Sequence, residues 1–227
     1  MRLGIDIGGT HIKYAPVSPH IGRVPMREQA DTPTTPGGLA RTLEDIICKS
    51  QRAYGPFERI GISAMGELDE KRGVIISASN IPGLSGFRLK EYVEKISGVS
   101  ATVGNDARCA LVAEMQLGAA KFSASCAMLT IGTGVGGAAA TREMLGNNSY
   151  FAELGHLPLI TNGLACTCGR KGCIESYLSC KALENDYYLM SGGKELRAWD
   201  ILANSGCDEQ AAAVSRRYFG HLANALR

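Results

Sequence analysis

The sequence has no apolar run long enough to cross a bilayer, and its N-terminus, MRLGIDIGGT, lacks the charged, apolar and small-residue sections of a signal peptide. We therefore expect a cytoplasmic protein with no membrane partner. The chain also lacks long runs of one charge sign, because its 24 basic and 22 acidic residues are interspersed and leave a formal net charge of +2. Without an extended basic patch, nucleic acid is not an expected partner.

The chain does have the length and composition of a folded protein. Its 227 residues, 45% hydrophobic and 20% charged, are enough for one large domain or two small ones that share a cleft. Apolar spacing typical of strands occurs at 3–7, 12–15, 59–63, 100–103, 126–131 and 135–141. Apolar spacing typical of helices occurs at 37–54, 89–96, 107–117, 198–204 and 210–226. These patterns predict strands and helices mixed along the chain.

Two glycine-rich turns, at 6–10 and 132–137, each join two predicted strands. Glycine lets backbone N–H groups approach an anion, while Asp6 can orient hydrated Mg²⁺ and Thr10 can donate from its hydroxyl. The first turn lacks the lysine-serine ending of a Walker loop. Taken alone, it is more simply a hairpin that needs glycine. The presence of two such turns favours the binding of successive phosphates of one nucleotide, as phosphoryl transfer requires.

Asp106 lies at a predicted strand-to-helix junction, within Gly104-Asn105-Asp106. A carboxylate at this position can accept the proton of an attacking hydroxyl as a general base. Aspartate is also common as a helix N-cap, and a side chain that caps its own helix points away from a substrate. The sequence leaves both roles open.

The eight cysteines fall into two groups. Five are scattered through apolar or helical segments, where we expect buried thiols: Cys48, Cys109, Cys126, Cys180 and Cys207. The other three join one histidine in a glycine-rich segment to form the ligand set of a closed tetrahedral zinc site: His156, Cys166, Cys168 and Cys173. Four unrelated residues are the weaker interpretation, because the segment has no core periodicity. A closed site predicts that zinc orders a loop and performs no Lewis-acid chemistry.

Carboxylates flank the predicted metal ligands. Glu153 precedes His156, and Glu175 follows Cys173 closely, so a bound metal would fix both carboxylates in space. Carboxylates accept hydrogen bonds from vicinal hydroxyls, and Asn80 and Asn105 can add donors and acceptors. Two surface glutamates are the alternative. We expect these side chains to bind a sugar.

Six motifs stand in order along nearly the whole chain: DIGGT at 6–10, SNIPG at 79–83, GND at 104–106, GTGVGG at 132–137, ELGH at 153–156 and CTCGRKGCIES at 166–176. In this order they resemble the ROK family of bacterial repressors, open-reading-frame proteins and sugar kinases. The resemblance implies an α/β, actin/hexokinase-like (ribonuclease H-like) fold with a cleft between two domains, 1–117 and 118–227. It also implies a homodimer and ATP-dependent phosphorylation of a hexose or N-acylhexosamine, with glucose and N-acetylmannosamine as the first candidates.

The resemblance further implies a role for each motif residue. Asp106 would be the general base. The sugar would be held by Asn80, Asn105, Glu153, His156 and Glu175. ATP and Mg²⁺ would be held by the two turns, through Asp6, Gly8, Gly9, Thr10, His11, Ile12, Gly132, Thr133, Gly134, Val135 and Gly136. Structural Zn²⁺ would be bound by His156, Cys166, Cys168 and Cys173.

The sequence departs from the family pattern in two notable places. Ala64-Met65-Gly66 stands where Pro-Gly is more common, in a loop that lines the sugar, so substrate preference can differ. The chain ends at Arg227 inside a predicted helix, and we expect a truncated chain, for which a sugar-binding or regulatory remnant is an alternative function. The DNA-binding repressor branch is disfavoured, because five residues before Asp6 are too few for a helix-turn-helix.

Overall fold

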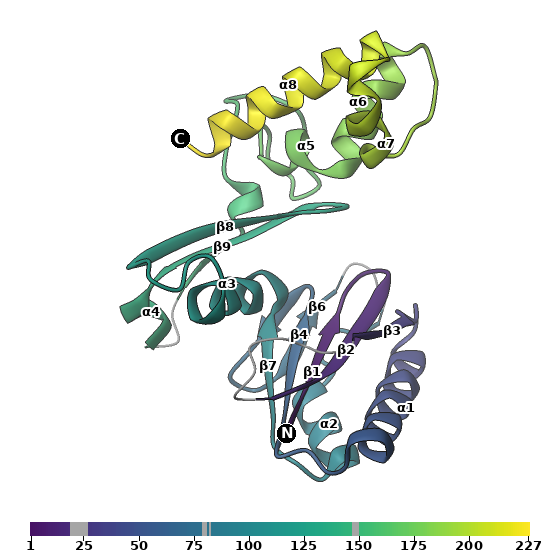
Figure 1. Cartoon of the computed structure of the whole chain (residues 1–227), viewed down its shortest axis with the longest axis vertical. Coiled ribbons are helices and arrows are strands. Elements are labelled where there is room, and N and C mark those ends of the chain that lie inside the picture. Colours follow the sequence, from purple (N-terminus) through teal and green to yellow (C-terminus); the bar gives the residue numbers. More distant parts are fainter. Residues whose placement is uncertain (19–26, 79–80, 82, 147–149) are drawn as a thin grey trace. The chain divides into compact units, whose positions relative to one another are not determined.

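The computed structural model describes residues 1–18, 27–78, 81, 83–146 and 150–227 (Figure 1). The chain forms two compact units, Met1–Ala113 and Glu114–Arg227. Among the described residues, no helix has the length and apolar character needed to cross a membrane.

The first unit is built on a five-stranded sheet with strand order β3-β2-β1-β4-β7. Its strands are β1 (Arg2–Ile7), β2 (His11–Val17), β3 (Glu28–Asp31), β4 (Arg59–Ala64) and β7 (Ala101–Asn105). Strands β1 and β2 form the antiparallel hairpin predicted around the first glycine turn. Strands β4 and β7 run parallel to β1, so these three strands end at the same edge of the sheet.

Alternation of side chains along the strands gives this sheet two different faces. Leu3, Ile5 and Ile7 of β1 point into the core, which is completed by helices α1 (Pro36–Tyr54) and α2 (Leu89–Ser97). Helix α1 begins where the Thr35 hydroxyl accepts a hydrogen bond from the Gly38 N–H, and it ends at Gly55. Proline in its first turn has no N–H to leave unpaired there.

The opposite face of the sheet carries small and polar side chains. A cavity of about 740 Å³ lies over this face and is lined by Gly4, Gly61, Thr102 and Ala15, among others. A short hairpin of β5 (Glu67–Asp69) and β6 (Val74–Ser77) lies outside the main sheet. Helix α3 (Asp106–Leu117) begins in the first unit directly after β7 and ends in the second.

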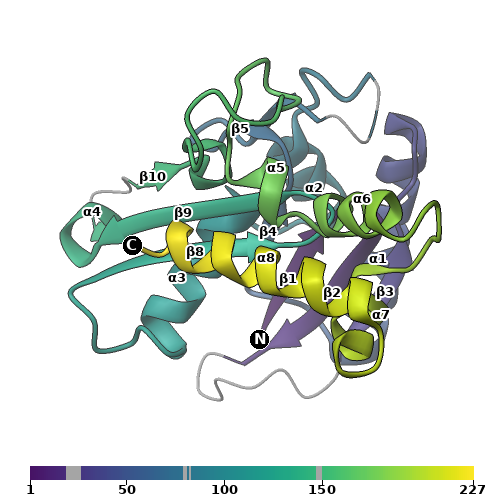
Figure 2. The same ribbon diagram turned by 90° about the horizontal axis from the view of Figure 1, so that it is seen from above.

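The second unit has a three-stranded sheet with order β10-β9-β8 and a group of helices. Its strands are β8 (Ser125–Ile131), β9 (Val135–Thr141) and β10 (Phe151–Ala152). Helix α4 (Arg142–Gly146) lies between β9 and β10, and the helices after β10 are η1 (Leu154–His156), α5 (Glu175–Leu178), α6 (Cys180–Met190), α7 (Ala198–Ala203), η2 (Asn204–Gly206) and α8 (Glu209–Ala225). Strands β8 and β9 form the second predicted glycine hairpin. Helices α5, α6 and α8 pack together around Leu178, Leu183 and Val214 (Figure 2).

The expectation of five buried thiols is wrong. Cys48 and Cys207 are exposed, and Cys109, Cys126 and Cys180 are only partly buried. Cys48 follows the buried Ile46 and Ile47 on α1, and one further residue turns a helix by about 100°, which carries its side chain out of the core.

Candidate functional site

The first glycine turn is fixed by hydrogen bonds within the first unit. The Gly8 N–H donates to the His11 carbonyl oxygen at 3.1 Å, and the Thr32 hydroxyl donates to the Gly8 carbonyl oxygen at 2.7 Å. The Thr32 N–H also donates to the Thr10 carbonyl oxygen at 2.9 Å. Gly9 and Thr10 are exposed at the tip, so the turn is rigid but accessible. Thr32, which follows β3, was not identified from the sequence, where no motif marks it.

The last two residues predicted for this turn lie on β2 and differ in exposure. The Nδ1 atom of His11 lies 3.2 Å from a carboxylate oxygen of Asp31 on the neighbouring strand β3. Ile12 is fully buried in the core. Only the backbone of Ile12 is therefore suited to contact a ligand.

Asp6 and Asp106 lie at the ends of β1 and β7, where the parallel strands finish together. Between them on β4, the Ser63 hydroxyl donates to Asp6 Oδ1 at 2.8 Å. Asp106 is exposed, and its Oδ1 accepts a hydrogen bond from the Ala107 N–H at 2.8 Å. The carboxyl ends of parallel strands are where α/β sheets gather ligand-binding groups.

Electrostatics distinguish Asp106 from an ordinary surface aspartate. Partial desolvation raises the pKa of Asp106 above its usual value, and the negative charge of nearby Asp6 raises it further. A higher pKa makes the carboxylate a stronger proton acceptor. This is the property that a general base requires.

Asn105, and not Asp106, has the geometry of the usual N-cap of α3. Its Oδ1 accepts from the Arg108 N–H at 3.2 Å, and its Nδ2 donates to the Gly66 carbonyl oxygen at 3.3 Å. An N-cap side chain accepts from the N–H two or three residues further on, which Asn105 does. The predicted sugar ligand Asn105 thus holds the junction together. The predicted ligand Asn80 lies outside the described residues.

The second glycine turn is tied to the helices that follow the cysteine-rich loop. The Val135 N–H donates to Glu175 Oε2 at 2.9 Å, and the Cys180 N–H donates to the Gly132 carbonyl oxygen at 2.8 Å. Gly132 also donates its own N–H to the Gly134 carbonyl oxygen at 2.9 Å. Thr133 and Gly136 remain exposed. The structure therefore brings together a residue expected to bind sugar, Glu175, and one expected to bind phosphate, Val135.

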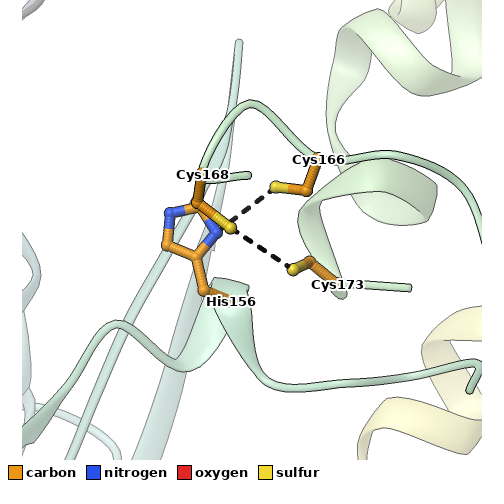
Figure 3. Close-up of side chains that lie close together, drawn as sticks. All are labelled: His156, Cys166, Cys168 and Cys173. Atoms are coloured by element: carbon orange, nitrogen blue, oxygen red, sulfur yellow. Dashed lines mark hydrogen bonds between the residues drawn. The ribbon is translucent and has the colours of Figure 1, made fainter. Parts of the chain in front are cut away.

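The four predicted metal ligands converge in the second unit. One ligand atom from each of His156, Cys166, Cys168 and Cys173 lies within 4.8 Å of every other, and Figure 3 shows the four side chains pointing toward one another. His156 comes from η1, and the cysteines come from the loop that ends at α5. Cys166 Sγ lies 3.5 Å from His156 Nδ1, and Cys168 Sγ lies 3.7 Å from Cys173 Sγ.

These separations suit a tetrahedral zinc ion. Zinc–sulfur bonds of about 2.3 Å and zinc–nitrogen bonds of about 2.0 Å place tetrahedral ligand atoms roughly 3.5–3.8 Å apart. Hydrogen bonding by the Arg170 backbone N–H lowers the pKa of Cys168 to about 6, whereas burial raises the pKa of Cys173 to about 11. The donor set fits zinc, which displaces protons from the thiols it binds.

Both predicted sugar carboxylates lie beside this cluster. Glu153 is exposed, and its Oε2 lies 3.8 Å from Nε2 of His156, the ring nitrogen opposite the one that faces Cys166. Glu175 Oε1 lies 4.0 Å from Cys166 Sγ. Glu153 has a φ of 61°, a left-handed conformation that costs free energy in a residue other than glycine. Strain of this kind is concentrated at binding and catalytic sites.

We predict that the second turn tolerates a methyl group at Gly132 but not at Gly134. A Cβ at Gly134 would lie 2.5 Å from Glu175 Oε2, whereas a Cβ at Gly132 has nothing within 4 Å. Gly134→Ala should lower the free energy of unfolding by about 1 kcal/mol, because the Glu175 carboxylate must move and lose its hydrogen bond with the Val135 N–H. Gly132→Ala is the matched control and should change it by less than about 0.5 kcal/mol. Urea denaturation measures both, and equal losses would contradict the contact with Glu175.

Comparison with known proteins shows that nearly the whole chain is similar to one protein family. The family model described as ROK family matches residues 2–227. The glucokinase of Streptomyces coelicolor is 34% identical over 185 residues, which cover 81% of this chain and 57% of that protein. The chain therefore matches little more than half the length of that relative. The N-acetyl-D-glucosamine kinase of Vibrio vulnificus (strain YJ016) is 31% identical over 237 residues, covering 98% of this chain and 77% of that protein.

Solved structures give the same result. A ROK family glucokinase from Streptomyces griseus, whose crystal structure is described as a complex with glucose and AMPPNP, is 28% identical, with a TM-score of 0.76. The match covers 96% of this chain and 75% of that one. The fold is thus the α/β, actin/hexokinase-like fold of ROK sugar kinases, and the chain belongs to the ROK family.

Proposed function

We propose that the protein transfers the γ-phosphate of ATP to a hydroxyl group of a hexose or an N-acylhexosamine, with glucose and N-acetylmannosamine as the first candidates. The observation that carries the proposal is Asp106 at the shared edge of β1, β4 and β7, with its pKa raised by desolvation and by Asp6. The kinase names of its relatives support the reaction class. Residues 1–117 and 118–227 are proposed as the two domains of the enzyme.

Asp106 is the proposed general base. Its carboxylate accepts the proton of the attacking sugar hydroxyl while the new bond forms between that oxygen and the γ-phosphorus. The bond from the γ-phosphorus to the bridging oxygen breaks, and ADP leaves with the electron pair. Asp6, held by the Ser63 hydroxyl, orients the hydrated Mg²⁺ that accompanies the phosphates.

The two glycine turns bind the phosphates through backbone N–H groups. In the first turn, the exposed Gly9 and Thr10 stand at a tip that Thr32 holds in place. In the second turn, the exposed Thr133 and Gly136 flank the Val135 N–H, which donates to Glu175. Rigid donors of this kind stabilise the charge of a transferring phosphoryl group without reorganising.

The sugar contacts of the second domain depend on the loop that carries the four proposed zinc ligands. His156 Nδ1 faces Cys166 and its Nε2 faces Glu153, so a zinc ion held on the Nδ1 side would leave a proton on Nε2, which could donate to a sugar oxygen or to Glu153. Glu153 and Glu175 accept hydrogen bonds from sugar hydroxyls. Asn80 and Asn105 complete the proposed sugar set. Zinc, when bound, orders the loop and takes no part in the phosphoryl transfer.

A homodimer is part of the proposal. It is supported by large apolar side chains on the second unit: Trp199 is 78% exposed, Leu189 is 70% exposed and Phe219 is 53% exposed. Exposed apolar groups of this size are common at protein interfaces.

A sugar-binding protein without turnover is the second candidate. One observation favours it: the Val135 N–H, which is proposed to bind phosphate, is bonded to Glu175. Sugar contacts at Glu153 and His156 do not depend on the Val135 N–H.

The reaction can be tested by coupled assay of ADP release over a panel of hexoses and N-acylhexosamines that includes glucose, N-acetylglucosamine and N-acetylmannosamine. We expect one sugar to be clearly preferred, because carboxylates fixed by a rigid loop select the arrangement of hydroxyls. Mass spectrometry of the product should show one added phosphate. No turnover across the panel by zinc-loaded protein, together with measurable sugar binding, would favour the second candidate.

Replacing the proposed base should remove turnover and spare binding. Asp106→Asn should lower kcat by about 10²–10⁴-fold, because the amide cannot accept the proton. Sugar affinity measured by calorimetry should change little. Asp45→Asn, at an exposed position on α1, is the control. Retention of kcat within about tenfold would exclude Asp106 from this role.

Metal analysis tests the zinc site directly. Freshly purified protein should contain about one zinc per chain, and Cys173→Ser should lose it and unfold at a lower temperature. Cys207→Ser replaces an exposed thiol outside the cluster and should keep the metal. Wild-type protein with well under one zinc per chain would contradict the assignment.

A further inference from the structure

The strand that leads to Asp106 lies at the edge of its sheet. In the strand order β3-β2-β1-β4-β7, β7 pairs with β4 on one side and is the outermost strand of the sheet that the described residues form. Backbone N–H groups on the outer side of an edge strand need another acceptor. The Asn105 N–H, directly before Asp106, is one of these groups.

A carboxylate from outside the sheet accepts that hydrogen bond. Glu70, which follows β5 in the β5–β6 hairpin, accepts the Asn105 N–H on Oε1 at 2.8 Å. Its other oxygen, Oε2, lies 3.1 Å from Nη1 of Arg108 in the first turn of α3. One side chain therefore connects the last residue of β7 with the first turn of α3, on either side of Asp106.

This ion pair differs from the usual surface pair. The side chains of Glu70 and Arg108 are 12% and 16% exposed, whereas those of the Arg88–Glu91 pair on the same unit are 64% exposed or more. Exposed pairs contribute little, but a shielded pair that also accepts a backbone hydrogen bond holds its neighbours in one geometry. The first turn of α3 packs closely on β7, since a Cβ at Gly104 would lie 2.8 Å from Cys109 Sγ and 3.4 Å from Arg108 Nη1.

We propose that Glu70 is a positioning residue for Asp106. The proposal rests on the proposed function, in which Asp106 is the base. Asn105 is held at three atoms: its N–H by Glu70, its Oδ1 by the Arg108 N–H and its Nδ2 by the Gly66 carbonyl oxygen. Because Asp106 is the next residue, these contacts set the direction in which its carboxylate leaves the backbone. A shift of about 1 Å in a reacting group can cost about 10²-fold in rate.

Two substitutions at Glu70 separate its functions. Glu70→Gln keeps an oxygen that can accept the Asn105 N–H but loses the charge that faces Arg108. Glu70→Leu has a similar size and loses both. We expect kcat to fall about 3–10-fold in Glu70→Gln and about 10–100-fold in Glu70→Leu. The KM for ATP should stay within about twofold, because the first turn does not involve Glu70. Glu91→Gln, which removes the carboxylate of an exposed arginine pair, is the control.

A second readout does not depend on catalysis. Hydrogen exchange at the Asn105 amide should be at least about tenfold faster in Glu70→Leu than in wild type. The leucine side chain cannot accept the hydrogen bond that protects this N–H from exchange with water. Circular dichroism and melting temperature identify a variant that does not fold, and Glu70→Gln then carries the kinetic test alone.

The outcomes distinguish the two proposals. An active wild type with kcat falling in the order wild type, Glu70→Gln, Glu70→Leu, at an unchanged KM for ATP, supports the positioning role. An active wild type whose Glu70 variants keep kcat within twofold, or lose no more than Glu91→Gln, overturns that role and leaves the kinase assignment intact. A wild type that phosphorylates no sugar overturns the kinase assignment and the role of Glu70 together.

Discussion

Backbone N–H groups at the ends of strands must be hydrogen-bonded. In this protein, carboxylates accept the hydrogen bonds of two such N–H groups, each of which lies at a proposed functional site. In the first unit, Glu70 accepts the N–H of Asn105 at the end of β7. In the second unit, Glu175 accepts the N–H of Val135 at the start of β9. Each carboxylate reaches its strand from a different element of the same unit. Carboxylates distant in sequence from these strands thus fix the two places where chemistry is proposed.

An anion beside a proposed catalytic or phosphate-binding group also changes its electrostatics. Charge–charge repulsion opposes the approach of a phosphate to the Val135 N–H while Glu175 occupies it. In the first unit, repulsion between Asp6 and Asp106 acts in a favourable direction, because it contributes to the raised pKa of the proposed base.

The parts of the fold and site that the sequence predicted are those whose signals are local. Alternating apolar residues predicted both glycine hairpins, and the spacing of His156 and the three cysteines predicted a cluster that the structure brings together. Contacts between distant residues could not be predicted in this way. Glu70 and Asn105 are 35 positions apart, and Glu70 stands in a run of charged residues typical of a surface turn. The role of Asn105 as N-cap depends on where α3 begins, and sequence patterns place helix ends poorly.

A metal at the proposed site would compensate for a loop that makes few contacts with the hydrophobic core. Leu157, Ile160 and Leu164 are 51%, 38% and 57% exposed, and only Leu159 of this segment packs partly against the core, so the segment between His156 and Cys166 buries little apolar surface. Its order comes from short-range hydrogen bonds and from close backbone approaches, as at Gly172, where a Cβ would lie 1.8 Å from the Ile160 carbonyl oxygen. A four-ligand metal site adds the cross-links that apolar packing does not provide. Because Glu153 and Glu175 lie at the two ends of this loop, the cross-links of a bound metal would stabilise the loop and would also fix the carboxylates proposed to bind sugar.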